Sequence, residues 1–131
     1  MIRTLLTIAL TLLLSLLLLT ADVWWRQKVQ FEQGAAGDRS GNFMVALTGY
    51  ESAIRMYLPF APRTEHAAVR IWALGESAEQ RGDIDQALLA YRSLRSAFYG
   101  TRWLRQPGQE WIERCDRKIT LLVPLRKGNQ S

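Results

Sequence analysis

The sequence predicts an all-α protein in which a single N-terminal transmembrane helix precedes a small stack of helical hairpins and a C-terminal capping helix. Three observations support this fold class. An almost unbroken apolar run extends from Leu5 to Ala21, later apolar residues recur every three or four positions, and part of that later pattern occurs twice. We therefore divide the chain into a transmembrane signal anchor at 1–25, a helical domain at 26–122 and a flexible tail at 123–131.

The apolar run is long enough to cross a membrane. No charged residue lies between Arg3 and Asp22, and as a helix the uncharged stretch between them would extend about 27 Å, close to the thickness of a bilayer core. Trp24 and Trp25 follow as an expected interfacial aromatic pair. A cleaved secretory signal is the alternative, although a cut at the end of the run would place the large Leu19 where a small residue is preferred.

Charges beside the run predict its orientation. The N-terminus and Arg3 give two positive charges on the short side, whereas Asp22, Arg26, Lys28 and Glu32 cancel on the other side. By the positive-inside tendency the N-terminus stays in the cytoplasm. We expect a single-pass protein of the inner (cytoplasmic) membrane whose C-terminal domain lies outside the cytoplasm, in the periplasm if the cell is Gram-negative.

One side of the membrane run is lined by small hydroxyl residues. Thr7, Thr11 and Ser15 recur every four positions, with Thr4 close to the same line. Small residues allow a second helix to approach closely, so this side is a candidate packing face for another membrane subunit. The alternative is that the hydroxyls bond back to their own backbone, as is common in membrane helices.

Composition limits the choice of partners. The chain is 48% hydrophobic and 22% charged, so it can form a core, and its net charge of +5 favours acidic partners or anionic lipid head groups. A domain outside the cytoplasm rarely meets nucleic acid, and we expect no nucleic-acid partner. Cys115 is the only cysteine, which excludes an intrachain disulfide. Its spacing from Trp111 and Ile119 predicts a small buried side chain rather than a reactive thiol.

Glycines and prolines divide the rest of the chain into helices. We expect a helix from Val23 to Gln33 that leaves the membrane without a break, and then a turn or frayed helix end over 34–41. Asn42 is a predicted N-cap for the next helix, which Pro59 and Pro62 would stop.

Thr64 is a predicted cap for a third helix that ends at the turn 81–83. A fourth helix begins at Ile84 and ends near Gly100. The last helix should run over 108–122, with Pro124 ending it.

Two stretches of the chain match each other residue by residue at a constant separation. This separation equals that between Gly41 and Gly82, and we call it the repeat offset. Gly41-Asn42-Phe43 is followed by Ala46, Leu47 and Tyr50, and Gly82-Asp83-Ile84 is followed by Ala87, Leu88 and Tyr91, while Gly34 matches Gly75 upstream. This pattern resembles the tetratricopeptide repeat, which has Leu-Gly in its first helix, Gly-Asp-aromatic at the turn, and Ala and Tyr in its second helix. The second unit, about 68–101, fits well, whereas the first, about 28–61, fits only in its second helix.

The resemblance also implies a binding surface. In tetratricopeptide proteins the first helix of each pair lines a concave groove, and the matching residues here are Val69, Trp72, Glu76, Glu79 and Gln80. A second candidate surface, for carboxylates or lipid phosphates, consists of Arg92, Arg95, Arg102 and Arg105. Its alternative is an ordinary solvated face.

The sequence contains no recognisable catalytic constellation. His66 and Cys115 are single residues of their types, which leaves no metal-ligand set of usual composition, and we expect no cofactor. These observations favour a non-catalytic accessory or scaffold subunit of a larger cell-envelope complex, with other membrane subunits as partners. The alternatives are a membrane-tethered adaptor that recruits a peptide or soluble protein, and a secreted soluble protein if the N-terminal segment is cleaved.

Overall fold

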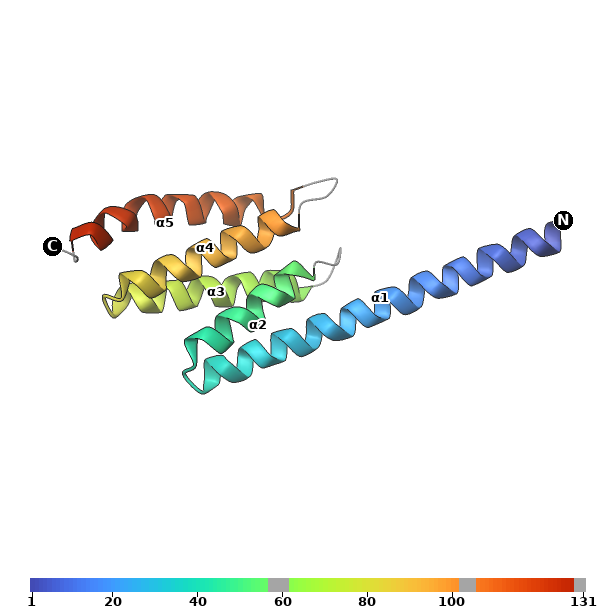
Figure 1. Cartoon of the computed structure of the whole chain (residues 1–131), viewed down its shortest axis with the longest axis horizontal. Helices are drawn as coiled ribbons and strands as arrows, with labels where there is room; N and C mark the ends of the chain where they lie inside the picture. Colours follow the sequence, from blue (N-terminus) through green and yellow to red (C-terminus); the bar gives the residue numbers. More distant parts are fainter. Residues whose placement is uncertain (57–61, 102–105, 129–131) are drawn as a thin grey trace.

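The computed structural model describes residues 1–56, 62–101 and 106–128, and the described residues form helices joined by short turns (Figure 1). The helices are α1 (Ile2–Arg39), α2 (Phe43–Arg55), α3 (Pro62–Gln80), α4 (Ile84–Gly100) and α5 (Gln109–Gly128). No strand occurs in these ranges. The predicted all-α class is therefore confirmed.

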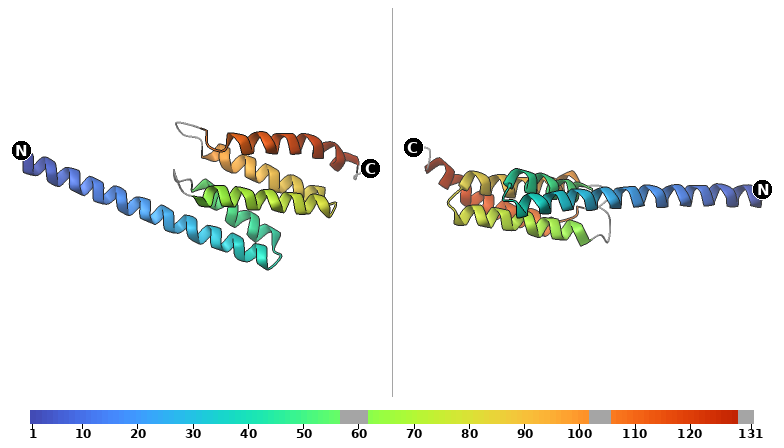
Figure 2. Two further views of the ribbon diagram at one scale, coloured as in Figure 1. Left: turned by 180° about the vertical axis from the view of Figure 1, so that it is seen from behind. Right: turned by 90° about the horizontal axis from the view of Figure 1, so that it is seen from below.

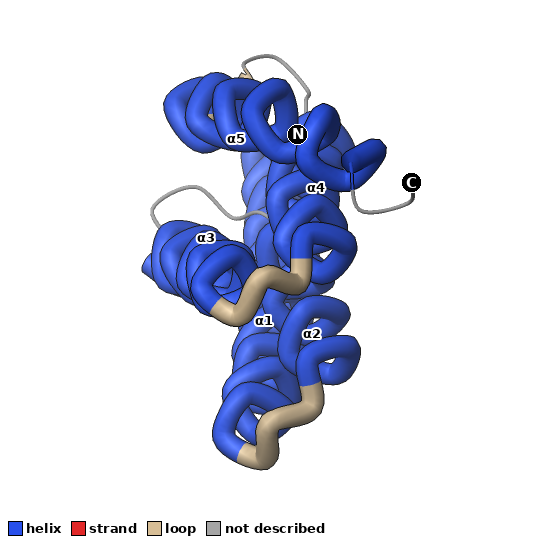
Figure 3. Tube along the Cα trace, turned by 90° about the vertical axis from the view of Figure 1, so that its left-hand side faces the viewer, coloured by secondary structure: helices blue, strands red, loops and turns tan. Residues whose placement is uncertain are grey.

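The helices are arranged as two antiparallel hairpins and a single final helix. The hairpins α1–α2 and α3–α4 lie one above the other, and α5 covers α4 on the far side (Figures 1 and 3). The described ends of the α2–α3 and α4–α5 connections lie on the side where α1 leaves the domain (Figure 2). The turns of both hairpins lie at the opposite end.

The two halves of α1 differ in their surroundings. Its N-terminal half extends away from the domain, and none of the residues in its most apolar 18-residue window is buried. Its C-terminal half packs against α2, where Gln27, Gly34 and Gly37 are buried. One N-terminal helix is thus long and apolar enough to span a membrane, a property that signal sequences share.

The two hairpin turns have the same backbone design. Gly41 and Gly82 both have φ of 74°, a left-handed conformation that glycine adopts without steric cost. The next residue caps the following helix in each case, because the Asn42 side chain accepts a hydrogen bond from Val45 N and the Asp83 side chain accepts one from Gln86 N. The sequence repeat is therefore also a structural repeat.

Glycines on the first helix of each hairpin allow the second helix to come close. A Cβ atom added at Gly75 would lie 2.7 Å from the Tyr91 ring, and one added at Gly34 would lie 2.9 Å from Tyr50 N. The α1–α2 crossing is the tighter one, since a Cβ at Gly49 would lie 2.4 Å from Gly34 N. Gly34 and Gly75, which match in the repeat, therefore both lie where the two helices of a hairpin come close.

A continuous core fills the space between the hairpins. Its fully buried large apolar side chains come from both repeats and the final helix and include Tyr50, Ile54, Ile71, Leu88, Tyr91, Leu94, Phe98 and Ile112. Cys115 is also fully buried, as its spacing predicted. Burial of such apolar side chains contributes about 2 kcal/mol each, which makes the hairpin contacts the main source of stability.

Two predicted helix boundaries are wrong, one at the end of α1 and one at the start of α3. The segment 34–41 is not mainly a turn, because α1 continues to Arg39. Gly34 and Gly37 serve there as small contact residues under α2 instead of ending the helix. Thr64 is not an N-cap, since α3 begins at Pro62. Proline suits a first helical position because its missing N–H would have no intrahelical partner.

The ends of α2 and α5 also differ from expectation. α2 ends at Arg55, before both prolines that were expected to stop it, and Pro59 lies outside the described residues. α5 includes Pro124 and continues to Gly128. An ion pair of 2.7 Å between Arg126 Nε and Asp85 Oδ1 ties this last turn to α4. Most of the predicted tail is therefore helical, and only 129–131 lie beyond the description.

Candidate functional site

Each hairpin carries a tyrosine that donates a hydrogen bond to a carboxylate on the hairpin's first helix. In the first hairpin Tyr50 OH donates to Asp38 Oδ2 at 3.1 Å, and Arg70 of α3 also binds this carboxylate. Because the cation comes from the next helix along the chain, the bond network joins the first hairpin to the second. Burial raises the pKa of Tyr50, so its phenol remains a donor at neutral pH.

The second hairpin repeats this arrangement at the repeat offset. Tyr91 OH donates to Glu79 Oε1 at 2.6 Å, and Lys118 Nζ of α5 lies 2.8 Å from the same oxygen. Burial, aided by the Glu79 charge, raises the pKa of Tyr91 strongly. Each hairpin is thus tied to the following helix by a tyrosine, a carboxylate and a cation.

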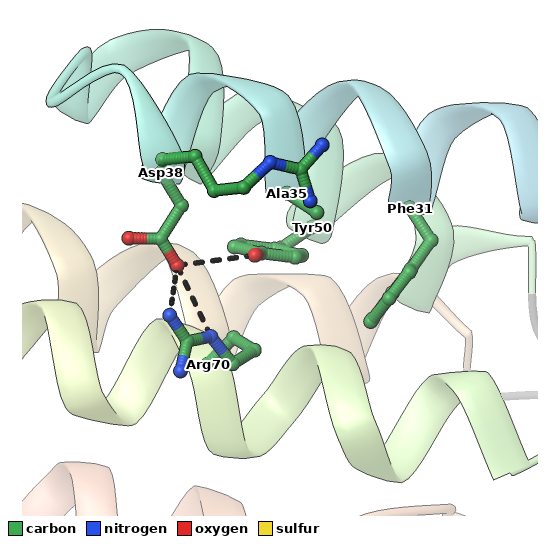
Figure 4. Close-up of a pocket in the computed structure, with 6 residues that line it drawn as sticks. Phe31, Ala35, Asp38, Tyr50 and Arg70 are labelled. Atoms are coloured by element: carbon green, nitrogen blue, oxygen red, sulfur yellow. Dashed lines mark hydrogen bonds and ion pairs between the residues drawn. The ribbon is translucent and has the colours of Figure 1, made fainter.

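A hollow of about 340 Å³ lies over the first of these networks (Figure 4). Its lining comes from α1, α2 and α3 and consists of Phe31, Ala35, Asp38, Arg39, Tyr50 and Arg70. Phe31 provides an apolar wall whose ring meets Tyr50 edge-on at 5.3 Å between centroids. Arg70 is neutralised by Asp38, whereas Arg39 forms no ion pair within the described ranges. This combination suits an apolar side chain beside a carboxylate.

The corresponding space in the second hairpin is filled by α5. Trp72 occupies the position of Phe31, packs on Tyr91 at 4.8 Å and lies 6.0 Å from Trp111. The guanidinium of Arg114 lies over both indoles, 4.4 Å from the Trp72 ring centroid and 4.5 Å from that of Trp111. Trp72 therefore packs against α5.

Some of the predicted groove residues on α3 are exposed, and others are bound to neighbouring side chains. Val69, Glu76 and Gln80 are exposed on α3, and Glu76 accepts a hydrogen bond from Trp72 Nε1 at 2.8 Å. Glu79 is bound to Tyr91 and Lys118. The binding groove stays a prediction. On this side of the helical stack, the open space is the hollow over the first hairpin.

Sequence reasoning did not identify the residues of the hollow. Phe31 and Asp38 precede Trp72 and Glu79 by the repeat offset, so the repeat alone could have found both. Arg70 had no such signal, because its partner is known only once α3 is placed beside α1.

The predicted arginine patch is only partly described. Arg92 is exposed on α4, whereas Arg95 pairs with Asp116 and stacks over the Tyr99 ring at 5.0 Å. Arg102 and Arg105 lie outside the described residues. Of the two described members, one already has an acidic partner, so the patch as a lipid or anion site stays a prediction.

The two tryptophans of the predicted interfacial pair each lie beside a cation. Trp24 and Trp25 are exposed, with the Arg63 guanidinium 4.5 Å from the Trp24 ring centroid and Lys28 Nζ 5.3 Å from that of Trp25. This arrangement is compatible with the predicted interfacial belt, which stays a prediction. The Arg63–Trp24 contact also joins α3 to the point where α1 enters the domain.

The hydroxyls of the predicted membrane packing face bond to their own helix. Thr7 Oγ1 donates to Thr4 O at 2.8 Å, and Thr11 Oγ1 donates to Thr7 O at 2.6 Å. Ser15 lies further along the same exposed part of α1. The side is thus small, and its threonines are already satisfied in their hydrogen bonding, which favours close packing over interhelical hydrogen bonds as its means of contact.

The described residues offer little for chemistry. Burial raises the pKa of Cys115 to about 12, so its thiol is protonated and unreactive at neutral pH. His66 is exposed on α3. No group of histidine, cysteine and acidic side chains within the described ranges is close enough to hold a metal ion.

Replacing Glu79 by glutamine is expected to flatten the acid dependence of stability. Burial alone would raise the pKa of Glu79, but hydrogen bonds from Lys118 and Tyr91 lower it below its ordinary value of 4.5. A lowered folded-state pKa adds stability above pH 4.5, and this contribution is lost as the pH falls through the folded value. Denaturant titrations from neutral to acidic pH should show the two proteins converging in stability. A difference independent of pH would contradict this assignment.

The chain was also compared with known proteins. It matches none of the protein-family models, none of the curated proteins and none of the solved structures against which it was compared. The resemblance to the tetratricopeptide repeat therefore stays a prediction, and the conclusions about function depend on the chain's own geometry.

Proposed function

We propose that this chain is a non-catalytic, single-pass membrane protein whose helical-hairpin domain serves as an accessory or scaffold subunit of a larger cell-envelope complex. The observation that carries the proposal is the continuity of α1. A membrane-length segment with no buried residue in its most apolar window leads, within the same helix, into residues that pack in the domain. The anchor thereby fixes how the domain is held relative to the bilayer.

This geometry supports a structural role. A rigid helix that enters the domain at one edge would hold the hairpins upright on the membrane. The described ends of the α2–α3 and α4–α5 connections lie on the side toward which the N-terminal half of α1 extends (Figures 1 and 2). The exposed sides of the hairpins are then presented to neighbours in the same membrane. The tetratricopeptide-like pattern and the net charge of +5 support protein partners and anionic lipid head groups.

Isolation of the complex tests this proposal. A tagged chain, expressed at native level and extracted in mild detergent, should retain its N-terminal segment by intact-mass measurement and copurify with other membrane proteins. Loss of a mass equal to that of segment 1–21 would establish the secreted alternative. Retention of the segment with no copurifying membrane protein would exclude the scaffold role.

Topology is expected to place the domain outside the cytoplasm. Arg117 is exposed on α5, so an Arg117→Cys variant should react with a membrane-impermeant maleimide in intact spheroplasts. The wild type is the control, because its buried Cys115 should label poorly. Labelling only after lysis would place the domain in the cytoplasm instead.

A membrane-tethered adaptor is the second candidate, and the hollow over Tyr50 favours it. The hollow combines the apolar Phe31 with Arg39, which is the pairing an acidic, partly apolar peptide requires. In this case an Arg39→Glu variant should lose a soluble copurifying protein, while Arg117→Glu, an exposed change on α5, should retain it. Equal recovery from both variants would exclude recognition at this hollow.

A further inference from the structure

The structural repeat shows that one face of the first hairpin lacks the cover that its counterpart has. In the second hairpin, the side facing α2 is packed: Ile71 and Ala90 are fully buried, and Leu74 and Gln86 are partly buried. Phe43 and Ala46 of the first hairpin lie on this side, lining a shared cleft with Leu74 and Gln86. This face of the repeat thus accommodates a neighbouring helix.

The equivalent face of the first hairpin is open. It contains a shallow hollow of about 270 Å³ lined by Gln30, Gln33, Met44, Val45, Thr48 and Gly49, which we call the outer face. Gln30, Gln33 and Gly49 precede Ile71, Leu74 and Ala90 by the repeat offset. Met44 and Val45 place large apolar side chains on this face, and they are 54% and 45% exposed.

We propose that the outer face is the contact between two copies of this chain standing side by side in the membrane. The inference rests on the membrane anchoring proposed above, because two anchors that enter from the same side orient both copies alike. Identical faces then meet about a two-fold axis along the membrane normal, the symmetry of most homodimers.

The chemistry of the outer face favours a second copy. None of its six lining residues is charged, although the chain carries a net charge of +5, so two such faces meet without the repulsion that most of this basic surface would produce. The amides of Gln30 and Gln33 are both donors and acceptors and can pair with the same amides of a partner. The apolar Met44 and Val45 supply surface to bury.

The membrane segment continues this face. At about 3.6 residues per turn, the separation of Ser15 from Gln33 in the continuous helix α1 amounts to five full turns. Ser15 therefore points in the same direction as Gln33 of the outer face, and Thr11, one turn earlier, lies beside it. A second copy seated on the outer face would bring the two membrane helices together along their small residues.

Cross-linking in native membranes tests this proposal. In a Cys115→Ala background, Gln33→Cys is compared with Thr120→Cys, an exposed position on α5 at the other end of the stack. A short bismaleimide should convert the Gln33→Cys protein into a species of twice the chain mass and leave the Thr120→Cys protein monomeric. Absence of this species, or an adduct with a different protein, would overturn the proposal.

A matched charge substitution makes the test independent of the cross-linker. Thr48 and Thr120 are both exposed helical threonines, and Thr48→Arg should lower the Gln33→Cys cross-linked fraction about tenfold whereas Thr120→Arg should not change it. Equal yields from both variants would also overturn the dimer. Each protein is first assayed for membrane retention, so a monomer that stays in the membrane refutes only the dimer, while release from the membrane refutes the anchoring as well.

Discussion

Replacing Gly49 by alanine is expected to lower the free energy of unfolding by about 2 kcal/mol, because overpacking outweighs the better helix propensity of alanine. The added Cβ would lie 2.4 Å from Gly34 N and 2.8 Å from Gln30 O, and these are backbone atoms of α1 that cannot turn aside. Overpacking of this kind costs about 3 kcal/mol. Alanine returns about 1 kcal/mol through its helix propensity, so the clash prevails.

An exposed residue away from the outer face provides the control for this change. Thr120 is exposed on α5, and Thr120→Ala should leave stability within about 0.5 kcal/mol of the wild type. The measurement is denaturant unfolding in mild detergent, followed by tryptophan fluorescence. If Gly49→Ala proved as stable as Thr120→Ala, the close α1–α2 crossing would be wrong.

The same crossing shows how far sequence reasoning reached. The periodicity and the turn glycines predicted four helices after the apolar N-terminal segment, and the repeat offset predicted the hairpin design. The helix ends near glycine and proline were the weak part. Gly34 and Gly37 read as breaks because glycine destabilises an isolated helix, but contact with α2 reverses that preference.

The candidate sites were less predictable than the helices. A groove assigned from one hairpin cannot show which of its residues the next helix will cover, and α5 covers Trp72. Conversely, Arg70 and Asp38 are far apart in the sequence and meet only because α3 lies beside α1. Contacts between hairpins depend on packing geometry, which periodicity within one helix does not encode.

Gln27 is the clearest example of a residue that the sequence did not reveal. It follows the apolar N-terminal segment among polar residues, yet its side chain is fully buried. Its Nε2 donates at 3.1 Å to both Ala53 O and Thr64 Oγ1, joining α1 to α2 and α3 at one point. Thr64, which was predicted to cap α3, thus accepts a hydrogen bond from a side chain of α1.

Replacing Gln27 by alanine should lower the free energy of unfolding by about 3 kcal/mol, through a cavity and the loss of buried hydrogen bonds. The change removes the donor for the Ala53 carbonyl and the Thr64 hydroxyl, and each buried group left without a partner costs about 1 to 3 kcal/mol. Glu32→Ala is the control, since Glu32 is exposed on the same helix and its loss should change stability by less than about 0.5 kcal/mol.

A double-mutant cycle then separates the hydrogen bond from the cavity. Gln27→Leu retains most of the side-chain volume, and Thr64→Val removes the hydroxyl that accepts from Gln27. If the two residues act through this bond, the double variant should be more stable than the sum of the single losses predicts, by about 1 kcal/mol. Strict additivity would mean that Gln27 stabilises the domain by packing alone.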